Sequence, residues 1–148
     1  MICYFDTSMV LKLLVDDEDV RDHAERLWRV ATAVLCVEIG YVEARAALAA
    51  VHRSGRLRTR SFATAKCELD RLWEQLAVVV VDTTLVRAAA ELAETARLRG
   101  YDAVHLAAAR RCGADVVVTA DRQLASAALT HGLAVAGAGT QSAGGAPK

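Results

Sequence analysis

The sequence predicts an α/β domain, in which helices cover both faces of a parallel sheet. A chain of 148 residues has the usual size of one domain with its own core. Hydrophobic residues make up 54% and charged residues 24%, with one proline, which is a globular composition. Short β-branched runs alternate with alanine-rich stretches of helix length. This alternation is typical of parallel strands joined by crossover helices.

Five short apolar runs predict the strands, in the order Ile2 to Phe5, Val34 to Cys36, Val78 to Val81, Val116 to Val118 and a weaker Leu133 to Ala136. Apolar residues with the helical period predict two helices, one carrying Val20, Ala24, Leu27, Trp28 and Ala31 and the other Phe62, Ala65, Leu69, Leu72, Trp73 and Leu76. Further helices are expected at Val37 to His52, Thr84 to Leu98 and Ala103 to Cys112. They should end near Gly55, Gly100 and Gly113, respectively.

Charge, cysteines and chain ends limit the possible functions. Lys plus Arg equals Asp plus Glu at 18 each, so any binding to a polyanion needs a local patch. The cysteines are too far apart for structural zinc or a redox dithiol, and we expect buried free thiols. No leader or membrane-length apolar run is seen, which predicts a soluble cytoplasmic protein. Residues 1–137 are expected to form the domain and 138–148 a flexible tail.

Four aspartates stand at or near the ends of predicted strands. Asp6, Asp82 and Asp121 follow strands, and Asp102 opens the helix before the fourth strand. The carboxyl ends of parallel strands face one crevice, so these acids are candidates for a shared site. Each could instead cap a helix. Asp6, Asp102 and Asp121 have no Glu or Gln three residues later, so none begins a capping box.

The second long helix offers two further acids, Glu38 and Glu43, which point about 140° apart. Glu43 lies on the small apolar face that is expected to lie against the sheet, together with Ile39, Gly40, Ala46, Ala47 and Ala50. Glu38 shares its face with Val42 and Arg45. A carboxylate on a buried face needs a neutralising partner, so Glu43 is the stronger candidate.

Carboxylates that converge on one crevice repel each other unless their pKa values shift or a cation binds. Oxygen ligands without nearby His or Cys pairs favour Mg²⁺ or Mn²⁺ over zinc. Such an ion can orient water and polarise a phosphate, which is the chemistry of phosphodiester hydrolysis.

Four segments, in this order along the chain, resemble PIN-domain ribonucleases and most closely VapC-type toxins of bacterial toxin–antitoxin pairs: YFDTS, YVEARAAL, YDAVHLAAA and VVVTADRQLASAA. The resemblance extends from Ile2 to about Ala136. It implies that Asp6, Glu43, Asp102 and Asp121 form a catalytic acidic metal site, with Thr7, Ser8 and Thr119 in support.

The resemblance also implies a three-layer α/β/α sandwich with a five-stranded parallel sheet in the order 3-2-1-4-5. Asp82 would then lie about 10 Å from Asp6 and serve as a helix cap. The implied activity is Mg²⁺-dependent cleavage of RNA that leaves a 5′-phosphate and a 3′-hydroxyl. The implied partners are RNA, a VapB-type antitoxin that inserts a basic side chain, and a second copy of the chain in a homodimer.

Basic residues near the acids are candidate RNA contacts, because phosphates call for Lys or Arg. They are Arg122, Arg45, Arg97 and Arg99. The denser run from Arg53 to Arg60 has three open roles: RNA binding, antitoxin binding or solubility. His105 is predicted to be structural, with a contact to the site or to phosphate as the less favoured interpretation.

Two other classes of α/β protein are excluded because residues that their active sites require are missing. A phosphorelay receiver needs paired acids after the first strand, and an aspartyl phosphatase needs a second Asp where Ser8 stands. A catalytically inactive PIN-fold protein-binding module is the stronger alternative.

Overall fold

The computed structural model describes residues 1–15 and 18–137, so the expected tail at 138–148 lies outside the described residues. In chain order the elements are β1 (Ile2–Phe5), α1 (Thr7–Leu14), α2 (Glu18–Val30), β2 (Ala33–Val37), α3 (Ile39–Arg53), α4 (Thr59–Gln75), β3 (Ala77–Val79), α5 (Thr83–Thr95), α6 (Gly100–Arg111), β4 (Val116–Val118), α7 (Arg122–Thr130) and β5 (Ala134–Ala136).

The five strands form one parallel sheet in the order β3-β2-β1-β4-β5, which confirms the predicted topology. From the central strand β1 the chain runs outward to β2 and β3, and it then crosses to β4 on the other side of β1, so the strand order reverses between β1 and β4. Ligands of open α/β sheets bind at such a switch point. Phe5 pairs with Val118 in the register, and the Asp6 N–H donates to the Val118 carbonyl at 3.1 Å. The residues that follow, Asp6 and Thr119, therefore lie side by side.

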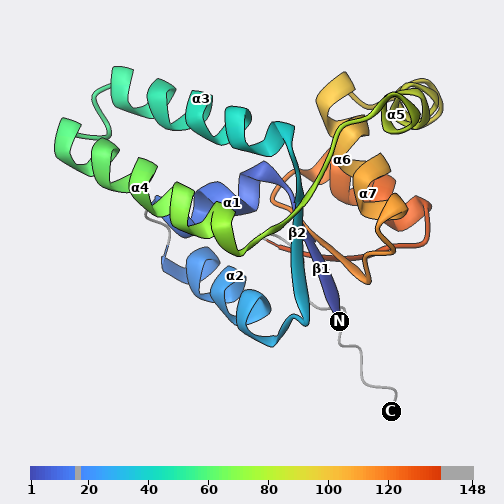
Figure 1. The fold of residues 1–148 in the computed structure, drawn as a ribbon, viewed down its shortest axis with the longest axis horizontal. Coiled ribbons are helices and arrows are strands. Elements are labelled where there is room, and N and C mark those ends of the chain that lie inside the picture. Colours follow the sequence, from blue (N-terminus) through green and yellow to red (C-terminus); the bar gives the residue numbers. More distant parts are fainter. Residues whose placement is uncertain (16–17, 138–148) are drawn as a thin grey trace, which may run out of the picture.

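Helices cover both faces of the sheet and make three layers (Figure 1). Successive side chains of a strand point to opposite faces. Tyr4 of β1 accordingly packs with residues of α5, α6 and α7, whereas Cys3 and Phe5 pack with residues of α1, α2, α3 and α4. Burial of these two apolar clusters is the main force that fixes β1 in the centre of the molecule.

The strand β3 is shorter than predicted, because Val80 and Val81 lie outside the ladder. The Glu38 N–H donates to the Val79 carbonyl, and the Val81 N–H donates to the Glu38 carboxylate at 3.2 Å. Glu38 thus ends the pairing of β2 with β3 and holds the segment that follows β3.

The boundary between α5 and α6 also differs from the prediction. Arg97 adopts a left-handed backbone with φ 54°, and α5 ends at Thr95 rather than at Leu98. Gly100 does not end a helix but begins α6, with Arg99 as the N-cap residue. Asp102 consequently lies in the first turn of α6, so its interpretation as a helix cap is wrong.

No bounds were predicted for α1 and α7. Their presence was suggested only by the possibility that Asp6 and Asp121 cap a helix. Both aspartates are N-caps whose side chains accept backbone N–H groups of the helix that follows. Asp82 is the N-cap of α5 and accepts the Leu85 N–H at 2.8 Å, which confirms its predicted role.

One face of α3 was predicted to lie against the sheet. In the structure, α3 instead packs beside α1 and α4. Its buried residues are Gly40, Ala44 and Leu48. Ala46 and Ala50, which were expected to lie against the sheet, are exposed. Glu43 is therefore at the edge of the buried face rather than in its middle.

No helix in the described ranges combines the length and the apolar character needed to span a bilayer. The four cysteines are free thiols. Cys3 and Cys36 are buried as expected, but Cys67 is exposed and Cys112 only partly covered, so burial was predicted wrongly for these two.

Candidate active site

Asp6 directly follows β1 at the switch point and is almost fully buried, with 5% of its surface exposed. One carboxylate oxygen accepts the Ser8 hydroxyl and the Met9 N–H, and the other accepts the Thr119 hydroxyl at 2.6 Å. Burial raises the pKa of Asp6 above its ordinary value, although these hydrogen bonds and the nearby His105 act in the opposite direction. A buried carboxylate of this kind gains from a cation placed beside it.

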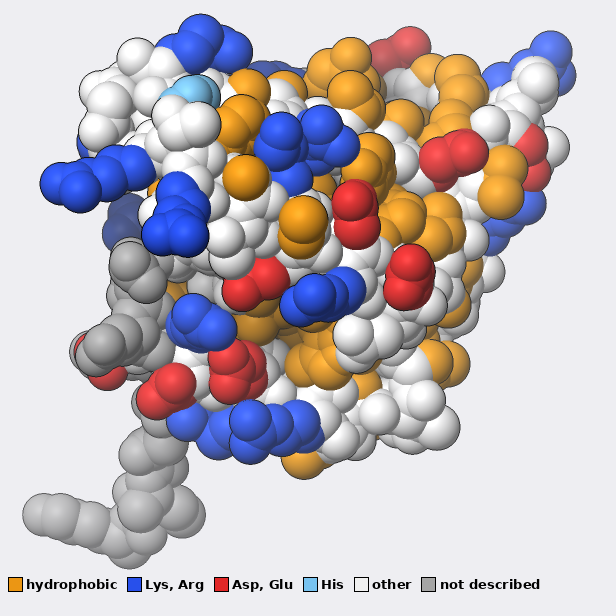
Figure 2. All heavy atoms as spheres, turned by 60° about the vertical axis from the view of Figure 1, so that its left-hand side comes forward, with side chains coloured by type: hydrophobic (Ala, Val, Ile, Leu, Met, Phe, Trp, Pro, Cys, Tyr) orange, Lys and Arg blue, Asp and Glu red, His pale blue; other side chains and the backbone are white. Residues whose placement is uncertain are grey.

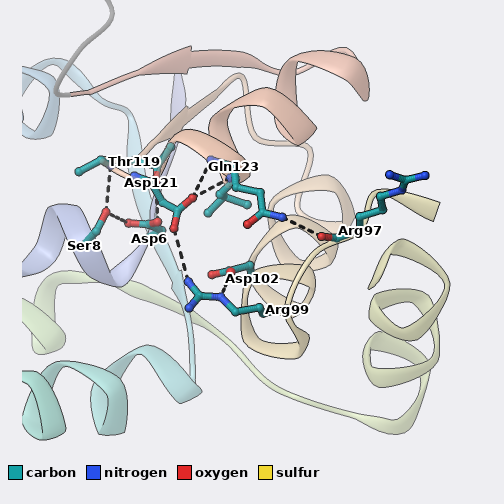
Figure 3. A network of polar contacts seen from close by, with 10 residues as sticks. Asp6, Ser8, Arg97, Arg99, Asp102, Thr119, Asp121 and Gln123 are labelled. Carbon is teal, nitrogen blue, oxygen red and sulfur yellow. Dashed lines mark hydrogen bonds and ion pairs between the residues drawn. The ribbon is translucent and has the colours of Figure 1, made fainter. Parts of the chain in front are cut away.

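Thr119 and Asp121 follow β4, next to the end of β1. The Thr119 hydroxyl accepts the Asp121 N–H at 3.0 Å while it donates to Asp6, so one buried side chain connects both acids. Oδ1 of Asp121 accepts the Gln123 and Leu124 N–H groups of α7 at 2.8 and 2.9 Å. These three contacts leave Oδ2 of Asp121 directed away from the helix (Figure 3).

Arg99 connects the remaining aspartate to this pair. Its Nε lies 3.2 Å from Oδ2 of Asp102, and its Nη2 lies 3.8 Å from Oδ2 of Asp121. Asp102 is mostly covered, but the Arg99 side chain is 78% exposed. Figure 3 shows Asp6, Asp102 and Asp121 around one region with the guanidinium of Arg99 at its rim. The positive charge among these acids is therefore held by an exposed, flexible side chain.

Glu43 reaches the site from the second turn of α3. Its Oε1 accepts the Thr7 hydroxyl at 3.0 Å and lies 2.7 Å from Nε2 of the buried His105. Partial burial raises the pKa of Glu43, but the hydrogen bond and charge of His105 and the hydrogen bond of Thr7 outweigh it, and the net pKa is lowered. Glu43 is thus ionised at neutral pH. Because Thr7 adjoins Asp6 in the chain, this cluster continues directly into the aspartate cluster.

The donor set suits a hard divalent ion, because it consists of carboxylate and hydroxyl oxygens. Within residues 1–15 and 18–137, no three His, Cys, Asp or Glu side chains stand close enough to ligate one ion together. Mg²⁺ commonly binds through one or two carboxylates and keeps several waters, so a preformed cage is not required. Asp6 and Asp121, joined through Thr119, provide such a pair, and Arg99 would have to move for Asp102 to join them.

The other predicted basic residues do not reach the acids in the part of the chain that the structure describes. Arg45 donates to the Tyr41 hydroxyl at 2.9 Å and lies over the Tyr41 ring. The Arg97 side chain points away from the acids, and its carbonyl accepts the Gln123 side chain (Figure 3). Arg122 is exposed. Of these four arginines, only Arg99 contacts an acid of the site within the described residues.

The basic run from Arg53 to Arg60 lies at the far end of α3. Ten residues separate Glu43 from Arg53, which places the run about 15 Å along the helix. Arg56, Arg58 and Arg60 line a surface cavity of about 550 Å³ with Arg21. Figure 2 shows Lys and Arg side chains distributed over this side of the molecule among acidic and hydrophobic ones. The run therefore does not join the acids.

Two polar residues gained importance only in the structure. His105 was predicted to be structural, yet it contacts the candidate ligand Glu43. Tyr4 was treated as part of an apolar strand, but its buried hydroxyl lies 2.8 Å from Nδ1 of His105. The available signal was the chemistry of Tyr itself, since a buried phenol hydroxyl nearly always has a polar partner.

The PIN-domain family model matches residues 3–129, which include all four acids. The chain belongs to the PIN-domain family. Within this family, the PIN domain described here is 37% identical over 137 residues to two proteins of Mycobacterium tuberculosis, ribonucleases VapC45 and VapC49. In each case the match covers 91% of this chain and 94% of the relative, so it places the chain among VapC proteins.

Solved structures agree with the fold of this PIN domain. The VapC20 toxin of Mycobacterium tuberculosis, which cleaves the sarcin–ricin loop, is 22% identical, with a TM-score of 0.65 over 84% of this chain and 94% of VapC20. VapBC2 of Rickettsia felis, bound to a DNA fragment from its promoter, is 12% identical and also has a TM-score of 0.65, over 92% of this chain and 98% of the matched chain.

Proposed function

We propose that this PIN domain is a divalent-metal-dependent endoribonuclease and the toxin of a toxin–antitoxin pair. The observation that supports it best is the Thr119 hydroxyl, which joins the buried Asp6 to Asp121 at the switch point of the sheet. A buried acid with a raised pKa beside a second acid is typical of a functional site rather than of a purely structural cap. The ribonuclease activity itself is supported by the identity to VapC45 and VapC49.

Mg²⁺ is the proposed cofactor, with Mn²⁺ as a substitute, and Asp6, Asp102, Asp121 and Glu43 would hold it. When bound, such an ion neutralises these acids and polarises the substrate phosphate. Its charge would also lower the pKa of Asp6 and so favour the ionised form that burial disfavours. Ser8 and Thr119 hold the Asp6 carboxylate in place from opposite oxygens.

The chain's own groups supply the remaining steps of hydrolysis. Glu43 is ionised and fixed at Oε1, so its carboxylate can accept a hydrogen bond from the attacking water and orient it. Arg99, exposed at the rim, can turn from Asp102 and Asp121 toward an RNA phosphate, where a guanidinium binds well. Water attack on phosphorus then breaks the bond to the 3′-oxygen and leaves a 5′-phosphate and a 3′-hydroxyl.

An antitoxin is the proposed protein partner. Solved complexes with the same fold, from Rickettsia felis and Haemophilus influenzae, are named VapBC pairs. A basic antitoxin side chain beside Asp102 and Asp121 would take the place that Arg99 occupies in the free chain. A homodimer and a cytoplasmic location are further parts of this proposal.

One observation favours a second candidate, an inactive PIN-fold binding module. Arg99 already balances two of the acids, so the site can persist without a metal. In that case Asp6 and Asp121 would serve only as helix N-caps.

Cleavage of a labelled single-stranded RNA pool with Mg²⁺, Mn²⁺ or a chelator separates the two candidates. We expect cleavage with either ion and a loss on the order of 100-fold in Asp6→Asn, the effect typical of removing one group that stabilises transition-state charge. Asp82→Asn is the matched control, because Asp82 caps a helix after the edge strand β3, two strands from β1 and outside the acid cluster. Equal cleavage by the wild type and Asp6→Asn would contradict the nuclease proposal.

A further inference from the structure

A buried row of polar groups leads from the backbone of β2 to Glu43. The Val37 N–H donates to the Tyr4 hydroxyl oxygen at 3.2 Å, and this hydroxyl lies 2.8 Å from Nδ1 of His105. Nε2 of His105 lies 2.7 Å from Oε1 of Glu43. Tyr4 is fully buried and His105 is 2% exposed. Four elements, β2, β1, α6 and α3, contribute one group each to the row.

The backbone N–H of Val37, at the start of the row, determines which group donates in each hydrogen bond that follows. A backbone N–H can only donate, so the Tyr4 oxygen accepts from Val37 and its own hydrogen is left for Nδ1 of His105. A neutral imidazole that accepts at Nδ1 carries its proton on Nε2. The Nε2–H group then points at Glu43. With a proton on Nδ1 instead, the Tyr4 oxygen would accept from both Val37 and His105, and its own hydrogen would lose Nδ1 as its acceptor.

We propose that Tyr4 and His105 are positioning residues that select one histidine tautomer and thereby fix the carboxylate of Glu43. This inference rests on the proposed function, in which Glu43 acts toward the ion and the attacking water. Oε1 of Glu43 takes both the Thr7 hydroxyl and the His105 Nε2–H. Among the described residues no hydrogen bond is made to Oε2, so this oxygen is available to a ligand.

The arrangement differs from that of an ordinary core histidine. The polar partners of a purely structural histidine are buried. One partner of His105 is Glu43, whose side chain is 28% exposed at the edge of the crevice. A long side chain in that position has several rotamers open to it, and ordering it costs entropy. The hydrogen bonds of Thr7 and His105 to Oε1 order the Glu43 side chain before a ligand binds. Residues behind a metal ligand usually act in this way.

The tautomer can be read without any activity. Long-range ¹H–¹⁵N NMR spectra of the metal-free protein, recorded over a pH series, should show the neutral form of His105 with its proton on Nε2. The carboxylate of Glu43 also favours a proton on Nε2, so it has to be removed before the effect of Tyr4 can be seen. Glu43→Leu should therefore keep the Nε2-protonated ring through Tyr4 alone, and adding Tyr4→Phe to this variant should give both tautomers. A wild-type ring protonated at Nδ1, or a tautomer that does not differ between Glu43→Leu and the double variant, would overturn the proposal.

Two substitutions of His105 separate positioning from folding. The amide nitrogen of Gln can reach the place of Nε2, whereas that of Asn reaches only the place of Nδ1. We expect His105→Asn to weaken Mn²⁺ binding, measured by electron paramagnetic resonance, about 10- to 100-fold, and His105→Gln to restore most of it. Melting temperatures of both variants check that each is folded.

The same titration distinguishes the two proposals. If Asp6→Asn binds Mn²⁺ as well as the wild type, the metal site of the proposed function is wrong. If Asp6→Asn loses binding but both His105 variants keep it, or both lose it equally at equal stability, the nuclease proposal stands and the positioning role is wrong.

Discussion

The hydroxyl of Thr119 donates to the carboxylate of Asp6 over 2.6 Å, although 113 residues separate the two in the chain. The same oxygen accepts the N–H of Asp121. This contact exists because Phe5 of β1 pairs with Val118 of β4, so the residues that follow both strands meet at the switch point. Strand register thus determines which acids share the site.

Replacement of Thr119 tests this junction. Thr119→Val keeps the shape but leaves the Asp6 carboxylate and the Asp121 N–H each without one partner. We expect the free energy of unfolding to fall by about 1–3 kcal/mol and Mn²⁺ affinity to fall about 10- to 100-fold. Chemical denaturation and Mn²⁺ titration measure these effects. Thr119→Ser retains the hydroxyl and should stay near the wild type; an equal loss in both variants would contradict the role of the hydroxyl.

The pKa of Asp6 predicts how stability changes with pH. Because burial raises this pKa in the folded protein, protonation of Asp6 stabilises the fold, and the contribution is lost as pH rises through the folded-state pKa. Metal-free Asp6→Asn, which cannot ionise, should therefore melt higher than the wild type at neutral pH. The difference should shrink toward about pH 4, near the ordinary pKa of Asp. Thermal unfolding with a chelator measures it, and a lower melting temperature at neutral pH would refute the burial argument.

Arg99 should compete with the metal. Arg99→Gln removes the positive charge near Asp102 and Asp121, and we expect Mn²⁺ to bind roughly two- to fivefold more tightly, since exposed ion pairs contribute up to about 1 kcal/mol. Isothermal titration with Mn²⁺ measures the change. Arg97→Gln is the matched control, because that side chain points away from the acids (Figure 3). Tighter binding in both variants, or in neither, would argue against competition.

Gly40 permits the close packing that brings Glu43 to the site. A Cβ at this position would lie 2.6 Å from Sγ of the buried Cys36 and 3.2 Å from the Trp73 ring. Gly40→Ala should therefore destabilise the protein by about 1–3 kcal/mol, measured by denaturant unfolding. Gly100→Ala is the control, since its Cβ would meet nothing within 4 Å and a helical alanine is favourable. Equal stabilities of the two variants would show that Gly40 is not tightly packed.

The repetition of strands and helices predicted the sheet and its two covered faces, because burial on both sides imposes that pattern. The positions of Asp6 and Asp121 after strands were also visible in the sequence. The start of α6 was not, since it depends on the left-handed backbone of Arg97, a conformation that this residue type rarely adopts. Gly100 was therefore assigned to the wrong helix.

Contacts between distant side chains were less predictable than the elements. The choice of Glu43 over Glu38 rested on a face of α3 that is in fact partly exposed. The contacts that distinguish the two acids come from His105 and Thr7 for Glu43, and from the backbone of Val81 for Glu38. These partners lie 36 to 62 residues away, and only the packed fold brings them together.

The central proposal is that Asp6, Glu43, Asp102 and Asp121 hold a divalent ion. An anomalous difference map from crystals soaked in Mn²⁺ tests it most directly. We predict a peak within ligand distance of Asp6 and Asp121, with Arg99 turned away from Asp102. Crystals that show no peak there at a Mn²⁺ concentration that supports RNA cleavage, with Arg99 still between Asp102 and Asp121, would contradict the account.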